Sequence, residues 1–246
     1  MGDRIPAALP GTEIIAIDRR GFGNSVEKGN QRGDVSSFER YLQDIDEACQ
    51  QIRDAHQGSK FFIFGKSLGC IHALRYAASH PGSASGLILA APPIKAKVGV
   101  PPALVVRVMV CLVVSPGTII DAGKYQSKGF RESEERKAVA DDSLMTLNYS
   151  ARYLYGVSGF IRTGLNNGKL VQEPVLILQG DADNAVDPIG ARQLLDTLPT
   201  KGKVLRTFPG ADHGFYDSLP LRPNTKYDDA RRKQVYDSIT DWLKAH

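Results

Sequence analysis

The segment Lys60-Phe-Phe-Ile-Phe-Gly-Lys-Ser-Leu-Gly-Cys70 constrains the fold more than any other part of the chain. Phe61 to Phe64 is a short apolar run of residues that favour β-structure, which predicts a buried strand. A helical pattern follows Gly69, with apolar residues at Ile71, Ala73, Leu74 and Ala77. The chain is therefore expected to turn sharply from a strand into a helix at Ser67.

Residues 65–69 form a Gly-x-Ser-x-Gly pattern, and its strand–turn–helix context predicts a nucleophile elbow. Residues without a Cβ let the strand and the helix approach closely, while the corner residue takes a strained backbone conformation. The Ser67 hydroxyl then stands clear of the backbone. The Leu68 N–H, at the positive end of the helix dipole, is the expected donor to an oxyanion.

The same letters also resemble the end of a phosphate-binding P-loop. That loop requires a glycine at position 60, where this chain has Lys60, and the intervening residues form an apolar run rather than a glycine loop. A nucleotide-binding P-loop is therefore excluded.

The bulk composition is that of one ordinary globular domain. The chain has 246 residues, 42% hydrophobic and 24% charged, so we expect a single domain over 1–246 with a sizeable core. The net charge is +4, but no block of lysine or arginine stands out, and nucleic-acid binding has no specific support.

The three cysteines, Cys49, Cys70 and Cys111, have neither zinc-site spacing nor a disulfide pattern, which favours a reducing compartment. The first residues lack the apolar core of a signal peptide. The most apolar stretch, 98–114, is too short to cross a bilayer. We therefore expect a cytoplasmic protein without stable membrane insertion, metal or cofactor.

Strands and helices alternate along most of the chain, which predicts a mostly parallel sheet with helices on both faces. The expected strands are 12–17, 61–64, 87–90, 175–179 and 203–208, and the expected helices outside the elbow run from Ser36 or Ser37 to Ala55, over 189–198 and over 227–244. Ligands of such sheets bind beyond the carboxyl ends of the strands. The glycine-containing loop 19–25 fails the dinucleotide pattern at Val26 and is interpreted as a structural turn.

Residues 94–169 interrupt the alternation, and the interruption is too long for a plain loop. We interpret it as a mainly helical cap over the site. The alternative is a pair of helices packed on the core without any role in substrate binding.

Three candidate catalytic residues follow the carboxyl ends of expected strands, in the order Ser67, Asp183, His213. This is the chain order of a hydrolase triad, in which the imidazole takes the serine proton and the carboxylate orients the imidazole. Asp181 and Asp187 compete for the role of the acid, and Asp212 is a weaker competitor.

From Glu13 to His246 the chain resembles the α/β-hydrolase superfamily, and within it the branch of monoacylglycerol lipases, lysophospholipases and serine aminopeptidases. The residues that carry the resemblance are Asp18-Arg-Arg-Gly-Phe-Gly-Asn-Ser25, Gly65-Lys-Ser-Leu-Gly69, Leu178-Gln-Gly-Asp-Ala-Asp183 and Gly210-Ala-Asp-His213. The resemblance selects Asp183 as the acid and places a cap at 94–169. Lys66 replaces a common histidine, and Cys70 replaces a frequent glycine.

The front of the chain departs from the family. Members have strands before the one expected at 12–17, and one of these ends in a His-Gly loop that supplies a second oxyanion donor. Residues 1–11 resemble the end of the helix after that loop, so we expect an N-terminally truncated sheet. Loss of one oxyanion donor costs about a hundred- to a thousand-fold in rate.

The resemblance implies a serine hydrolase that cleaves a small acyl ester, such as a monoacylglycerol or lysophospholipid, through an acyl-enzyme. Haloalkane dehalogenation is disfavoured because it needs a carboxylate at position 67. The alternative is a non-catalytic or impaired member of the fold that acts as a binding protein or fragment, because the second oxyanion loop is missing.

Overall fold

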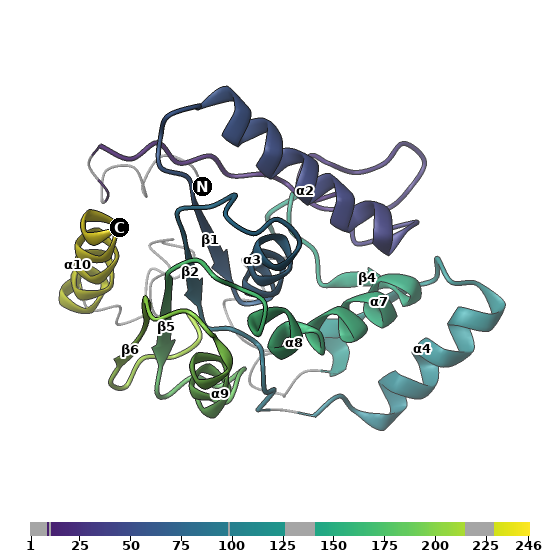
Figure 1. Cartoon of the computed structure of the whole chain (residues 1–246). Coiled ribbons are helices and arrows are strands. Elements are labelled where there is room, and N and C mark those ends of the chain that lie inside the picture. The colour runs from purple at the N-terminus through teal and green to yellow at the C-terminus, as the bar shows by residue number, and fades with distance from the viewer. Residues whose placement is uncertain (1–8, 10, 98, 126–140, 215–228) are drawn as a thin grey trace.

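The structure is a computed structural model that describes residues 9, 11–97, 99–125, 141–214 and 229–246 (Figure 1). Its centre is a parallel sheet of four strands in the order β1-β2-β5-β6. The strands are β1 (Phe62–Lys66), β2 (Gly86–Ala90), β5 (Val175–Gly180) and β6 (Lys203–Phe208). All four were predicted, with small shifts of their ends.

The register brings the carboxyl ends of the strands to one edge of the sheet. Lys66 pairs with Ala90, Ala90 pairs with Leu178, and Gly180 pairs with Phe208. The three candidate catalytic residues, which follow β1, β5 and β6, therefore leave the sheet on the same side.

Helices cover both faces of the sheet (Figure 1). Helix α10 (Asp229–Ala245) packs on the face formed by residues such as Ile88 and Leu176. Helices α3 (Leu68–Ser79) and α9 (Ile189–Thr197) pack on the opposite face, formed by residues such as Leu87 and Ile177, and the short α8 (Gly164–Gly168) lies against them. Successive side chains of a strand point to opposite faces of the sheet, so consecutive apolar residues pack in both cores. Strands covered on both faces therefore appear in the sequence as continuous hydrophobic runs.

Helix α2 (Phe38–Ala55) begins where the sequence predicted, because the Ser37 hydroxyl accepts a hydrogen bond from the Arg40 N–H. Its buried residues, Tyr41, Ile45 and Cys49, face a cluster that includes Tyr153. The helix thus contacts α3 and the segment 94–169.

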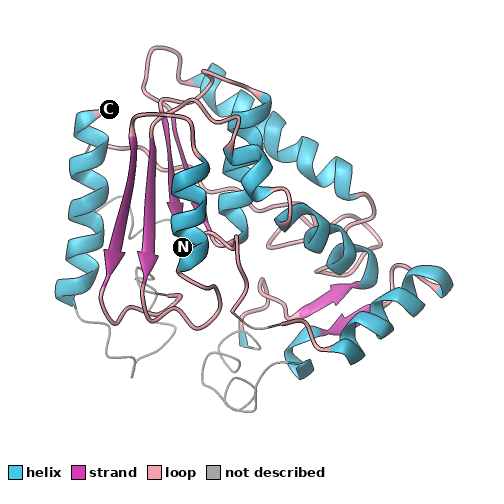
Figure 2. Ribbon diagram, turned by 60° about the horizontal axis from the view of Figure 1, so that its bottom comes forward, coloured by secondary structure: helices cyan, strands magenta, loops and turns pink. Residues whose placement is uncertain are grey.

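The segment 94–169 contains more than helices (Figure 2). Within the described residues of this segment, the elements are α4 (Pro102–Val114), β3 (Ile119–Asp121), the 3-10 helix η1 (Ala122–Tyr125), β4 (Asn148–Ser150), α7 (Ala151–Ile161) and α8. The antiparallel pair of β3 and β4 was not predicted. The Ser150 N–H donates to Gly33 O, and Arg152 pairs with Asp34, so this segment is attached to the loop before α2.

The strand expected at 12–17 is wrong. These residues have no regular secondary structure and pair with no strand in the described part of the chain, and the side chains of Ile15 and Ile17 are 45% and 42% exposed. A run of β-forming residues becomes a strand only beside a partner that accepts its hydrogen bonds.

Two other expectations fall partly on residues that the structure does not describe. Most of the expected N-terminal helix end over 1–11 lies outside the described residues, as do the first two residues of the expected last helix. Among the helices that are described, none is long and apolar enough to cross a membrane.

Candidate active site

Ser67 occupies a strained corner between β1 and α3. Its φ of 46° and ψ of −118° lie in a region that non-glycine residues rarely adopt. A Cβ at Gly65 would lie 2.5 Å from the Gly69 carbonyl oxygen, so only glycine fits there. The structure therefore confirms the sharp strand–turn–helix corner predicted from the sequence.

The first N–H groups of α3 have no acceptor within the helix, as at every helix start. The Leu68 N–H is one of them, and it follows Ser67 directly. This position suits a donor to an oxyanion formed at the Ser67 hydroxyl.

Cys70 lies beneath the corner and is fully buried. Its Sγ lies 3.2 Å from both Gly65 O and Ala90 O, at the ends of β1 and β2. Burial raises the pKa of this thiol well above its ordinary value. The cysteine is therefore a small packing residue with weak hydrogen bonds, which explains why it is tolerated behind the serine.

The structure brings Asp183 and His213 together. The His213 Nδ1 lies 2.8 Å from Asp183 Oδ2, while Asp183 Oδ1 accepts from the N–H groups of Ala185 and Val186 at 2.8 and 2.9 Å. Burial alone would raise the pKa of the fully buried Asp183, but the hydrogen bonds from His213 and the two N–H groups outweigh it and hold the pKa below its ordinary value. The carboxylate is thus kept ionised to accept from the imidazole.

The two competitors for the acid have other partners. Asp181 Oδ1 accepts from the Gly210 N–H at 2.6 Å. Asp187 pairs with Lys95 at 2.8 Å and accepts from the Ile189 N–H at the start of α9. The weak competitor, Asp212, accepts from the Gly214 N–H at 2.9 Å. The bonds to the Ile189 and Gly214 N–H groups stabilise local turns, whereas those to Gly210 and Lys95 join separate segments of the chain.

Ser67 is not joined to the imidazole in the same way. Among the described residues, no hydrogen bond links the Ser67 hydroxyl to His213. The two residues follow β1 and β6, the outer strands of the sheet, whose axes are roughly 14 Å apart at three strand spacings. A contact between Ser67 and His213 would therefore require the loop after β6 to carry the imidazole back toward the serine.

Two supporting contacts were not predicted. Gln179, which is 1% exposed, donates through Nε2 to Gly180 O at 3.0 Å and to Asp183 Oδ2 at 3.2 Å. Lys97 donates through Nζ to the backbone oxygen of Asp183 at 2.8 Å. A polar residue ending the apolar strand 175–179 was the one available signal for Gln179, whereas nothing local pointed to Lys97.

Residues 95–97, which follow β2, form backbone hydrogen bonds with the loop that carries Asp183. Lys97 N–H donates to Ala185 O, Asp187 N–H donates to Lys95 O, and Ala96 forms a bridge with Val186. The position of the loop that carries Asp183 is thus tied to the start of the segment 94–169.

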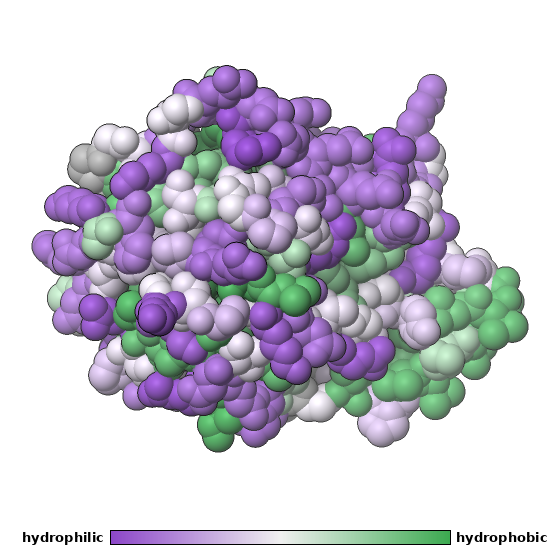
Figure 3. All heavy atoms as spheres, viewed as in Figure 1, coloured by the Kyte–Doolittle hydropathy of each residue, from purple (hydrophilic) through white to green (hydrophobic). Residues whose placement is uncertain are grey.

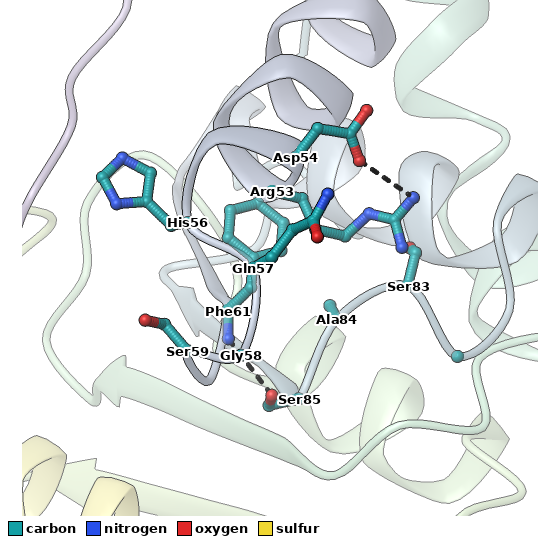
Figure 4. Close-up of a pocket in the computed structure, with 11 residues that line it drawn as sticks. Arg53, Asp54, His56, Gln57, Gly58, Ser59, Phe61, Ser83, Ala84 and Ser85 are labelled. Carbon is teal, nitrogen blue, oxygen red and sulfur yellow. Dashed lines mark hydrogen bonds and ion pairs between the residues drawn. The ribbon is translucent and has the colours of Figure 1, made fainter.

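A hollow of about 380 Å³ lies at the other end of the sheet (Figure 4). It is formed by the end of α2 and the loop before β2, and Arg53, Asp54 and Ser83 are among its lining residues. Phe61, which precedes β1, places it at the amino ends of the strands. It is therefore separate from the edge that carries Ser67, Asp183 and His213.

Residues 7–217 match the family model described as serine aminopeptidase, S33 (Hydrolase_4), which covers most of the chain. The chain belongs to this family. It is an α/β-hydrolase of the branch that contains monoacylglycerol lipases, as the resemblance in the sequence implied. The family match, together with the lipases that the chain resembles, makes it a carboxylic ester hydrolase.

Relatives similar in sequence to the chain include monoacylglycerol and monoglyceride lipases. The monoacylglycerol lipase of Mycolicibacterium smegmatis is 24% identical over 247 residues, with 96% of this chain and 79% of the relative covered. The monoglyceride lipase of Homo sapiens is 23% identical over 229 residues, with 92% and 74% covered.

Solved structures show the same fold. The monoacylglycerol lipase of Paleococcus ferrophilus aligns with a TM-score of 0.70 and 25% identity, covering 92% of this chain and 80% of that one. A soluble variant of monoglyceride lipase from Saccharomyces cerevisiae, in complex with a substrate analog, aligns with a TM-score of 0.72 and 22% identity over 93% and 76%.

Proposed function

We propose that this hydrolase cleaves monoacylglycerol- or lysophospholipid-like esters through an acyl-enzyme formed on Ser67. His213 takes the Ser67 proton as the hydroxyl oxygen attacks the ester carbon, and then gives that proton to the departing alcohol. Asp183 orients the imidazole and stabilises its cation. A water molecule, deprotonated by His213, then releases the acid and restores Ser67.

The contact between Asp183 and His213 carries this proposal. A fully buried carboxylate that accepts from the Nδ1 of a partly exposed imidazole leaves the opposite nitrogen, Nε2, to serve as the base. The strained corner at Ser67, with the Leu68 N–H beside it, supplies the matching nucleophile and one oxyanion donor.

The substrate class is supported by the relatives, which are named monoacylglycerol and monoglyceride lipases. We propose that residues 94–169 act as a cap within a single domain, and the apolar residues of α4 suit an acyl chain more than a peptide. The three free cysteines support a cytoplasmic location.

Labelling with a fluorophosphonate and turnover of acyl esters test the proposal together. We expect the protein to be labelled and to hydrolyse a short p-nitrophenyl ester and a monoacylglycerol. Ser67→Ala should abolish labelling and lower kcat by about a thousand-fold or more. Ser238→Ala, at a partly exposed serine on α10, is the matched control and should change neither.

The other outcome identifies the alternative. A folded protein that binds these esters without hydrolysing any of them, or labelling that survives Ser67→Ala, would overturn the catalytic proposal. The first of these results would indicate a binding protein with the hydrolase fold.

A further inference from the structure

The segment 94–169 begins with a short charged stretch before the chain becomes apolar. Lys95 and Lys97 are the only charged residues in 91–106. Helix α4, which follows, keeps an apolar outer surface that Figure 3 shows as a green lobe where α4 lies in Figure 1, and Val113 in this helix is 86% exposed. The two lysines at the start of the segment, in contrast, both have polar partners, and these partners differ.

Each lysine contacts a different aspartate. Lys95 Nζ lies 2.8 Å from Asp187 Oδ2, in a carboxylate that also accepts from the first N–H of α9. Lys97 Nζ donates instead to the main-chain oxygen of Asp183, also at 2.8 Å. A hydrogen bond from a charged donor is stronger than one between neutral groups. Lys97 therefore holds the peptide group that directly follows the Asp183 side chain.

This peptide group controls how the Asp183 carboxylate is held. Asp183 Oδ1 accepts from the N–H groups of Ala185 and Val186 at 2.8 and 2.9 Å, so the chain curls back over its own carboxylate. The curl depends on the rotation about the Cα–C bond of Asp183, and the hydrogen bond from Lys97 fixes the oxygen at the end of that bond. With Oδ1 held by the turn, Oδ2 is the oxygen that contacts His213.

The stretch of chain that carries Lys97 also contacts the serine corner. Ala90 O, at the end of β2, accepts from the Ser67 N–H at 2.9 Å. Seven residues later, Lys97 contacts the turn after Asp183 with both its backbone N–H and its Nζ. Residues 90–97 thus connect the nucleophile corner to the turn of the acid, and Lys97 holds that turn from a support that Ser67 shares.

We propose that Lys97 is a positioning residue that acts on the reaction through Asp183. Its ammonium group keeps the turn after Asp183 in the conformation that directs Oδ2 toward His213 Nδ1. Lys97 does not touch the substrate. This role rests on the proposed function, in which Asp183 and His213 assist Ser67.

The kinetic test compares Lys97→Met with Lys95→Met in the hydrolysis of a p-nitrophenyl ester. Methionine keeps an unbranched stem and removes the donor, and both lysines are exposed, so both variants should fold. We expect Lys97→Met to lower kcat about 10-fold with KM unchanged, because the turn of the acid loses a charged hydrogen bond and the substrate loses no contact. Lys95→Met, the matched control with Asp187 as its partner, should stay within about twofold of the parent.

A spectroscopic readout separates positioning from stability. The proton that His213 Nδ1 donates to Asp183 Oδ2 should give a low-field resonance in proton NMR, and the resonance is identified by its absence in His213→Gln. In Lys97→Met this resonance should move upfield, at a temperature where urea unfolding shows that the variant is fully folded. In Lys95→Met it should stay in place. Lys97→Arg, which keeps a charged donor, should restore both the resonance and kcat.

Three results would overturn the proposal. They are an unchanged kcat in Lys97→Met, an equal loss of kcat in Lys95→Met, and a loss of kcat that accompanies a loss of stability while the resonance stays in place. A parent that shows the low-field resonance and hydrolyses no ester would count against the proposed function alone. In that case the resonance of Lys97→Met still reports whether Lys97 positions Asp183.

Discussion

His213 Nδ1 lies 2.8 Å from Oδ2 of Asp183, a carboxylate with no exposed surface. The two residues are 30 positions apart and follow neighbouring strands, β5 and β6. Because Asp183 Oδ1 is already occupied by two backbone N–H groups, the direction in which Oδ2 faces is set by the turn after β5. The tautomer of the imidazole follows from that geometry.

Asp183→Asn should lower kcat by about 10⁴-fold, because an amide in this position favours the wrong imidazole tautomer. Steady-state hydrolysis of a p-nitrophenyl ester measures it. Asp181→Asn and Asp187→Asn, which remove carboxylates engaged with Gly210 and with Lys95, are the controls and should stay within about tenfold of the parent. A larger loss of kcat in Asp187→Asn than in Asp183→Asn would show that Asp187, and not Asp183, is the acid.

Gln179→Leu should lower kcat by about 10- to 100-fold with little change in KM, because the hydrogen bond to Asp183 Oδ2 is lost. Gln179→Glu brings a second carboxylate to that oxygen, and we expect the pH–rate profile to shift to higher pH as the pKa of the coupled pair rises. A purely structural role would lower stability in both variants and leave the profile where it was.

Arg152→Met should lower the free energy of unfolding by about 2 kcal/mol, because Asp34 is buried and accepts from Arg152 at 2.8 and 2.5 Å. Adding Asp34→Asn to this variant should restore part of the loss, because no unpaired charge then remains. Urea unfolding of the two variants and the parent gives both values. If adding Asp34→Asn lowered the free energy of unfolding still further, the ion pair would not be what joins the segment 94–169 to the core.

The pKa of His72 is lowered from its ordinary value to about 3 by burial and by the charges of Arg19 and Arg75. In the unfolded chain His72 is therefore protonated below about pH 6.5, whereas in the folded chain it stays neutral until about pH 3. The free energy of unfolding should fall as pH decreases through this window, by up to about 1.4 kcal/mol per pH unit from this group.

His72→Gln provides the comparison, since Tyr41 OH, now 3.1 Å from Nε2, could bond the amide instead. The difference between the parent and the variant is best measured from pH 6.5 to 5, above the ordinary range of carboxyl groups. If the free energies of unfolding of the parent and the variant changed equally with pH over that range, His72 would be protonated as readily in the folded state as in the unfolded state.

Cys111 should be the thiol that reacts in the native protein. Cys49 and Cys70 are buried, and burial raises the pKa of Cys49 to about 11 and that of Cys70 further, while Cys111 is partly exposed on α4. Titration with a disulfide reagent should detect one thiol before denaturation and three after it.

The structure around Ser67 was predicted well from the local sequence. An apolar run, two glycines and a following helical pattern interact within a few positions, so local sequence determined the corner. The choice of Asp183 among three nearby aspartates rested on the family resemblance, and the burial and hydrogen bonds of the carboxylate now supply the physical reason to prefer it. The join between Ser67 and His213 remains a prediction.

The failures have a common cause. Residues 12–17 have the composition of a strand but no partner among the described residues, and the pair of β3 and β4 forms across a separation that no local pattern spans. The hydrogen bond from Lys97 to Asp183 joins residues 86 positions apart. Such contacts depend on where whole elements pack.

By itself the sequence determined the serine corner, the alternation of strands and helices, and the edge of the sheet where chemistry is expected, because these depend on short-range backbone preferences and on apolar periodicity. Only the tertiary structure decided which aspartate is buried against His213, that Gln179 and Lys97 support it, and that α4 keeps a bare apolar face. Those features depend on burial and on partners distant in the chain, which no local pattern of residues specifies.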